Sequence, residues 1–99
     1  MRNNDKRYEN IASIPNAGKR SYGALSYYIA EGLEPGLPDV IIAIPKIPLH
    51  GMFIEFKRRP NKISNEQFKW AERLKWAGYA IKVCWSFEDA KKTTEDWMS

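Results

Sequence analysis

Short apolar runs alternate with amphipathic segments along the second half of the chain. Three runs, at residues 40–44, 52–57 and 80–85, have the length of strands. Two segments, 64–77 and 87–97, place apolar side chains at helical spacing. The first two strands are joined by a short connection and should be antiparallel. The order strand, strand, helix, strand, helix predicts an α/β domain, with a sheet covered by helices.

Turn and capping residues mark where these elements end. Residues 45–51 contain two prolines and a glycine and predict a loop. Ser64 and Gln67 fit a capping box at the start of the next helix. Upstream, we expect a short apolar stretch at 11–14, a proline- and glycine-containing turn, and a helix at 23–31.

Length and composition indicate one small domain with an apolar core. The chain has 99 residues, of which 43% are hydrophobic, which suits a single domain over residues 1–99. No apolar run approaches the roughly 18–20 residues that span a membrane, and the polar N-terminus predicts no signal peptide. Cys84 is the only cysteine, so we expect neither an intrachain disulfide nor a Cys/His zinc site. A buried thiol fits a cytoplasmic protein.

Positive charge is concentrated in two clusters, and the net charge of +4 favours an anionic partner. One cluster is Lys19 and Arg20, and the other is Lys57, Arg58, Arg59 and Lys62. Solvated loops are the simplest explanation of such clusters. Contact with nucleic-acid phosphates is the alternative.

Two acids and a lysine are predicted to converge on adjacent strands. Glu55 and Lys57 are two residues apart, so both side chains lie on one face of their strand. A hairpin folded about the middle of 45–51 would pair Asp39 with about residue 57, near Lys57 and diagonal to Glu55. Such cross-strand neighbours lie about 5–8 Å apart, and two carboxylates at that distance can share a hard cation. A surface network of opposite charges is the structural alternative.

The metal-binding alternative has a definite chemistry. Asp39 and Glu55 would hold Mg²⁺, which in turn holds a phosphate oxygen and a water that Lys57 orients, and the reaction is phosphodiester hydrolysis. Gln67 lies on the helix face that points toward the sheet, near the end of the Glu55–Lys57 strand. It can cap the helix, contribute to the site, or do both.

Three segments in this order resemble a known group of nucleases. They are Gly36-Leu37-Pro38-Asp39, Ile54-Glu55-Phe56-Lys57 and Gln67-Phe68-Lys69-Trp70. Together they resemble the PD-(D/E)XK nuclease superfamily, and most closely its VRR-NUC (virus-type replication-repair nuclease) branch. Segments 15–21 and 77–79 also resemble this branch, so the similarity spans about residues 11–88.

The resemblance implies a fold and a set of roles. The fold is a small mixed β-sheet flanked by helices, a restriction-endonuclease-like core. Asp39 and Glu55, with the backbone carbonyl of Phe56, bind Mg²⁺ or Mn²⁺, Lys57 is the catalytic lysine, and Gln67 belongs to the site. The substrate is DNA, branched or flapped, cut during replication, repair or recombination. Relatives of this size resemble phage or mobile-element proteins, which implies the cytoplasm of a bacterial or phage-infected cell.

One family feature is not evident near the N-terminus. Members usually carry a glutamate on a longer helix well upstream of residue 15, and Glu9 is the only glutamate here before that point. Either Glu9 substitutes for this acid, or the acid is missing, or a partner chain supplies it.

A homodimer is also expected. Four tryptophans are many for so small a core, and aromatic residues are enriched at interface centres. Most of them should be packed internally, with Trp70 or Trp76 left for an interface.

Three functions remain open from the sequence. The first is a divalent-metal-dependent endonuclease, and the second is a nucleic-acid-binding module of the same fold that does not cut. The third is a small interaction domain in which the basic loop, residues 58–63, is only solvated. The set of Asp39, Glu55 and Lys57 favours the first, because two acids facing a phosphate repel DNA unless a cation lies between them.

Overall fold

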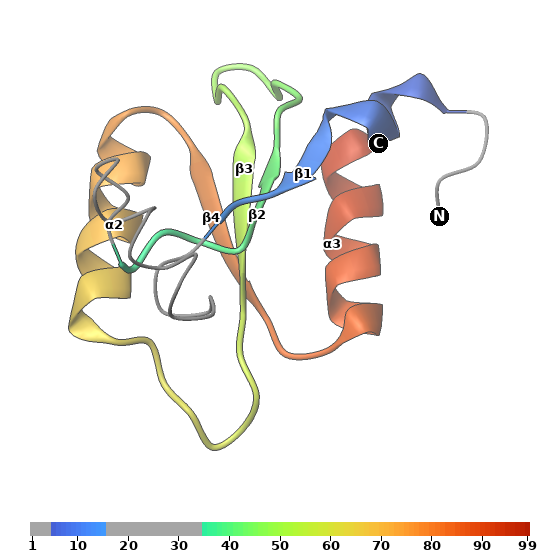
Figure 1. Ribbon diagram of the computed structural model, residues 1–99. Helices are drawn as coiled ribbons and strands as arrows, with labels where there is room; N and C mark the ends of the chain where they lie inside the picture. Colours follow the sequence, from blue (N-terminus) through green and yellow to red (C-terminus); the bar gives the residue numbers. More distant parts are fainter. Residues whose placement is uncertain (1–4, 16–34) are drawn as a thin grey trace.

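A computed structural model describes residues 5–15 and 35–99 of the chain (Figure 1). The helix predicted at 23–31 lies outside these residues, as do Lys19 and Arg20. The described part contains a four-stranded sheet, a short 3-10 helix and two α-helices. Their bounds are η1 Lys6–Asn10, β1 Ile11–Ser13, β2 Val40–Ile42, β3 Met52–Phe56, α2 Asn65–Trp76, β4 Ala80–Cys84 and α3 Phe87–Met98.

The sheet is mixed, as the sequence predicted. Its strand order is β1-β2-β3-β4, with antiparallel pairing from β1 to β3 and parallel pairing between β3 and β4. Helix α2 connects the two parallel strands and packs on one face of the sheet, while α3 covers the other (Figure 1). The α/β prediction is confirmed, and the apolar stretch at 11–14 forms the edge strand β1.

The apolar core lies between the sheet and α3. Its buried members are Ile42, Met52, Ile54, Cys84 and Ala90. Alternation along β3 sends Met52 and Ile54 to this face, so Phe53 and Glu55 take the other. Cys84 is fully buried, as expected, and burial raises the pKa of its thiol.

The register of the β2–β3 hairpin differs from the prediction. Lys46 and Leu49 exchange two backbone hydrogen bonds of 3.0 and 2.9 Å, so the tip of the hairpin is Ile47 and Pro48. A tip at Ile47 and Pro48 shifts the pairing by one position from a fold about the middle of 45–51. Three residues on the β2 side, 43–45, then lie across from two on the β3 side, 50 and 51, which shifts it by a second position. Val40 therefore pairs with Ile54, two positions away from the predicted register.

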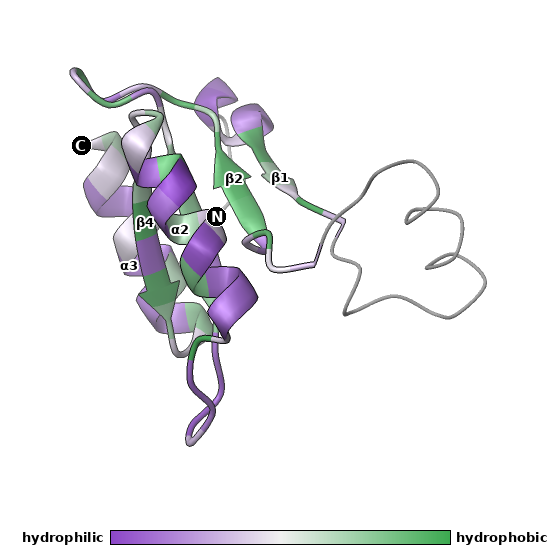
Figure 2. Cartoon of the chain, turned by 90° about the vertical axis from the view of Figure 1, so that its left-hand side faces the viewer, coloured by the Kyte–Doolittle hydropathy of each residue, from purple (hydrophilic) through white to green (hydrophobic). Residues whose placement is uncertain are grey.

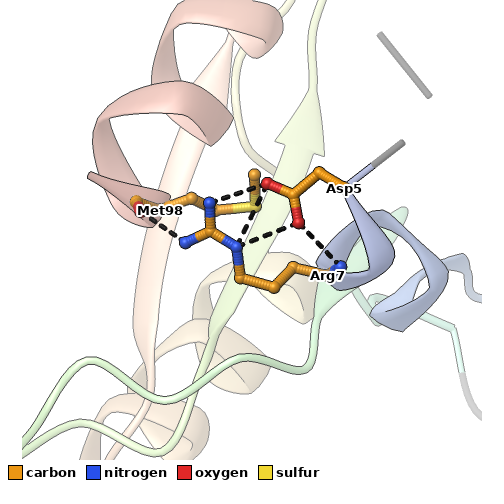
Figure 3. Close-up of polar contacts among 3 residues, drawn as sticks. All are labelled: Asp5, Arg7 and Met98. Carbon is orange, nitrogen blue, oxygen red and sulfur yellow. Dashed lines mark hydrogen bonds and ion pairs between the residues drawn. The ribbon is translucent and has the colours of Figure 1, made fainter. Parts of the chain in front are cut away.

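A polar contact joins the N-terminal and C-terminal parts of the described chain (Figure 3). Arg7 donates to both carboxylate oxygens of Asp5, and its Nη1 donates to the carbonyl oxygen of Met98 at 2.6 Å. A cation at the last carbonyls of α3 also opposes the negative end of the helix dipole. Side-chain hydrogen bonds from Arg7 lower the pKa of the Asp5 carboxyl.

Figure 2, viewed from the α2 side, shows where polar residues gather. The loop between β3 and α2 forms a hydrophilic extension at one end of the molecule, beyond the carboxyl end of β3 (Figure 2). Among the described elements, no helix is both long and apolar enough to cross a membrane.

Candidate active site

Asp39 and Glu55 lie on neighbouring strands at one end of the sheet. Asp39 directly precedes β2, and the pairing of Val40 with Ile54 places it beside the end of β3. Its backbone N–H donates to the carbonyl of Ile54 at 3.0 Å. Its carboxylate Oδ2 accepts the N–H of Phe56 at 2.8 Å. Asp39 therefore bonds to the residues on either side of Glu55 and lies closer to Glu55 than the predicted pairing with residue 57 implies.

Glu55 is a buried acid with polar partners. The residue is 3% exposed, although a carboxylate is costly to bury unless hydrogen bonds or charges compensate it. Its Oε2 accepts a hydrogen bond of 2.9 Å from Nε2 of Gln67. The same oxygen lies 3.9 Å from Nζ of Lys57, whose side chain is 14% exposed. The structure thus brings together Glu55, Lys57 and Gln67 on the α2 side of β3.

Gln67 caps α2 and contacts Glu55 at the same time. Its Oε1 accepts the backbone N–H of Ser64 at 2.9 Å, and its own N–H donates to Oγ of Ser64 at 3.1 Å. Because Oε1 is used in the capping box, Nε2 is the end that reaches the carboxylate of Glu55. The capping box and the predicted proximity to the Glu55–Lys57 strand are both confirmed.

The donor set suits a hard divalent cation that keeps much of its own water. Asp39 and Glu55 supply carboxylate oxygens, which Mg²⁺ and Mn²⁺ prefer. Mg²⁺ is commonly held by one or two carboxylates, with waters and substrate phosphate completing its shell. Within residues 5–15 and 35–99, no group of three or more His, Cys, Asp or Glu side chains is arranged to hold a metal. A site here would consist of two acids and the predicted carbonyl of Phe56.

Comparison with known proteins identifies the family. The sequence profile of the VRR-NUC domain matches residues 5–88. The chain belongs to the VRR-NUC domain family. A solved structure, a VRR_NUC domain protein, is similar over 98% of this chain and 76% of its own, with a TM-score of 0.77 and 22% identity. That likeness shows the fold, and no curated protein matches the chain. VRR-NUC domains are generally nucleases, which act on nucleic acid by phosphodiester hydrolysis and typically use divalent metals.

The structure separates Glu9 from Asp39 and Glu55. Glu9 is exposed in η1, which leads into β1. The neighbouring Asn10 is bonded to Ala43, beyond one end of β2, whereas Asp39 lies at the other end. Four steps along β2 separate the level of Asn10 from that of Asp39, roughly 13 Å at the usual rise of a strand. Within the described chain, Glu9 therefore lies away from Asp39 and Glu55.

The basic loop extends from the same end of the sheet as the two acids. Arg58, Arg59 and Lys62 are all exposed, directly after Lys57. Arg59 stacks on Trp85, with its guanidinium carbon 4.5 Å from the ring centre. The sequence predicted only packing for Trp85. Arg59 and Trp85 each closely follow a strand, and the two strands are parallel neighbours whose carboxyl ends meet at one edge of the sheet, which brings the two residues together.

The other tryptophans differ in exposure. Trp97 packs against the core and donates through Nε1 to the carbonyl of Ile44 at 2.8 Å, as internal packing predicts. Trp76 is 91% exposed at the end of α2, so it does not pack internally in the described chain.

Proposed function

We propose that this VRR-NUC protein is an endonuclease that hydrolyses DNA phosphodiester bonds with Mg²⁺ or Mn²⁺. The observation that carries the proposal is that Asp39 bonds to the residues on either side of Glu55, while Lys57 and Gln67 lie at the carboxylate of Glu55. A buried charge network without chemistry would gain little, since apolar residues of similar volume stabilise a fold as well or better.

Each side chain has a distinct role in this proposal. Asp39 and Glu55 hold the cation, and Gln67 fixes the carboxylate of Glu55 by donating a hydrogen bond. Lys57 has donors only and no lone pair to offer, so it orients water or stabilises the negative charge that develops on the phosphate. When bound, the divalent cation lowers the pKa of a coordinated water and neutralises phosphate charge.

The substrate proposed is branched or flapped DNA, bound partly through Arg58, Arg59 and Lys62, with Lys19 and Arg20 as a second contact. We also propose a homodimer, whose two sites would address two strands of a symmetric junction. The exposed Trp76 is available for such an interface. The activity would operate in the cytoplasm of a bacterial or phage-infected cell.

The decisive experiment is cleavage of an end-labelled flapped duplex with Mg²⁺, with Mn²⁺, and with EDTA. We expect products only with a metal present. A protein that binds the duplex but leaves it intact with both metals would instead be the non-cleaving binding module. Sedimentation at micromolar concentration tests the dimer, and a single species near 11.5 kDa would contradict it.

A further inference from the structure

A hollow lies beside the candidate active site, between the basic loop and the end of β4. It has a volume of about 350 Å³ and is lined by Arg59, Pro60, Asn61, Lys62 and Trp85. We call it the Trp85 hollow. All five lining residues are neutral or basic, and Trp85 is 38% exposed. Its volume falls within the range of small-molecule sites, about 300–1,000 Å³.

The parallel pairing of β3 and β4 places this hollow next to the catalytic lysine. Phe56 pairs with Cys84, and the backbone N–H of Lys57 donates to the carbonyl of Cys84 at 3.0 Å. Lys57 directly follows β3 and Trp85 directly follows β4, so the two residues leave the sheet side by side. A DNA strand whose phosphate reaches Lys57 therefore has a neighbouring nucleotide within reach of Trp85.

The backbone at Trp85 is held in place independently of the basic loop. Its N–H donates to Oδ2 of Asp89 at 3.0 Å, and the N–H of Asp89 donates to Oγ of Ser86, the N-cap of α3. The backbone that carries the indole is thus attached to a capped helix terminus. A fixed backbone leaves only the two side-chain torsions of Trp85 to be ordered when a ligand stacks on the ring.

We propose that the Trp85 hollow binds one unpaired nucleotide of the DNA substrate, adjacent to the phosphate that is cut. The base stacks on the indole of Trp85, and its phosphate contacts Arg59 and Lys62. An exposed Arg–Trp contact is weaker than base–aromatic stacking, so an incoming base can displace the guanidinium of Arg59 toward the phosphate. The inference rests on the proposed nuclease function and specifies its substrate as DNA with an unpaired nucleotide beside the cut.

A paired base is a poor ligand for this hollow. In a duplex each base is already stacked on its neighbours, and extracting it costs the unstacking and unpairing energy. A single strand or a flap carries no such cost. The hollow therefore favours unpaired DNA, whereas the phosphate contacts of the basic loop bind either form.

The test measures DNA binding with EDTA present, so that the result does not depend on cleavage. Fluorescence anisotropy gives the Kd for a 12-nucleotide thymidine strand and for a blunt 12-base-pair duplex. For Trp85→Leu we expect single-strand affinity to fall about 5- to 100-fold, the usual range for losing one stacked base. Duplex affinity should stay within about twofold, and Trp85→Phe should keep most single-strand affinity.

Ile47→Ala is the control. Ile47 is 92% exposed at the tip of the β2–β3 hairpin, at the opposite end of the sheet from the Trp85 hollow. This variant should bind both DNA forms as the wild type does. Wild-type affinity for Trp85→Leu, or an equal loss for single strand and duplex, would overturn the proposal.

A second measurement uses only the wild-type protein and so does not depend on whether Trp85→Leu folds. A series of flapped duplexes, each with one abasic position in the flap, is compared for binding with EDTA present, because the junction fixes which nucleotide reaches the hollow. One stacked base predicts that affinity falls sharply at a single position, and equal affinity across the series would overturn the proposal. If these binding results hold while no DNA is cut with metal, the Trp85 hollow stands and the proposed nuclease function fails.

Discussion

On the α3 side of β3, Ile54 is 2% exposed and packs with Ala90 in an apolar core. One residue further along, on the α2 side, Glu55 is 3% exposed but is surrounded by Lys57 and Gln67. The two positions are almost equally buried, so burial alone does not distinguish them. What differs is the helix that covers each side of the sheet. Helix α3 presents apolar residues to Ile54, whereas α2 presents its capping Gln67 to Glu55.

The comparison shows how one short strand serves both stability and the candidate site. The period of two along β3 separates the two tasks by face. If this separation is real, substitutions on the α2 face should affect cleavage with little effect on folding. Substitutions on the α3 face should do the reverse.

The largest effect is expected from removing charge at the candidate site. Asp39→Asn and Glu55→Gln each keep an oxygen that can accept the existing hydrogen bond, from Phe56 and Gln67 respectively, but lose the negative charge. We expect cleavage to fall at least about 100-fold, since metal affinity and phosphate stabilisation are both lost. Single-turnover cleavage rates with Mg²⁺ measure this.

Thermal unfolding provides the control for these two variants. Their melting temperatures should remain within a few degrees of the wild type. A wild-type cleavage rate in either variant would show that the site is misassigned, and loss of folding in both would show that the acids are structural.

On the opposite face, Ile54→Ala should lower the free energy of unfolding by about 2–5 kcal/mol, the usual cost of truncating a buried aliphatic side chain. Urea denaturation measures the loss. Ile47 is 92% exposed at the hairpin tip, so Ile47→Ala should change stability by less than about 0.5 kcal/mol. Equal effects from the two isoleucines would mean that the core does not lie on the α3 face.

Much of this arrangement could be predicted from the sequence. Strand and helix positions followed from local periodicity, and the capping box at Ser64 and Gln67 set the start of α2. That Glu55 and Lys57 share one face of β3 followed from their spacing of two residues. Each of these depends on residues within a few positions of one another, where the pattern is determined by local geometry.

The hairpin register could not be predicted in the same way. It depends on which residues of 45–51 form the tip, and two prolines in that segment allow more than one choice. Backbone bonds between Lys46 and Leu49 set the tip, and one extra residue on the β2 side completes the two-residue shift, which moves Asp39 from the level of Lys57 toward that of Glu55. The Arg59–Trp85 contact was missed because it requires knowing that β3 and β4 are adjacent.

Gln67 tests whether capping and site chemistry can be separated. Ser64→Ala and Gln67→Ala both remove the capping box and should each cost about 0.5–2 kcal/mol of stability. Only Gln67→Ala also removes the hydrogen bond to Glu55. We expect it to lower cleavage by about 10-fold or more, as loss of an outer-shell partner usually does, with Ser64→Ala near wild type. Equal cleavage by the two variants would reduce Gln67 to a helix cap.

The smallest effect should come from the exposed pair at the chain ends, which contrasts with the buried pair at Glu55. Asp5 and Arg7 are only 2.7 Å apart, shorter than the 3.9 Å between Glu55 and Lys57, yet both are far more exposed. Water screens such a pair, so its distance is a poor guide to its contribution. We expect Asp5→Asn to lower the melting temperature at pH 7 by at most a few degrees.

The pH dependence of this small effect has a definite sign. Hydrogen bonds from Arg7 lower the folded-state pKa of Asp5 below its usual 3.8, so the folded state binds a proton less readily than the unfolded chain. The contribution of Asp5 is therefore complete above about pH 4 and is lost as the pH falls through the folded-state pKa. Melting curves of wild type and Asp5→Asn should differ at pH 7 and converge in strong acid. A difference that stays constant down to pH 2 would mean that the carboxylate charge plays no part in holding η1 against the end of α3.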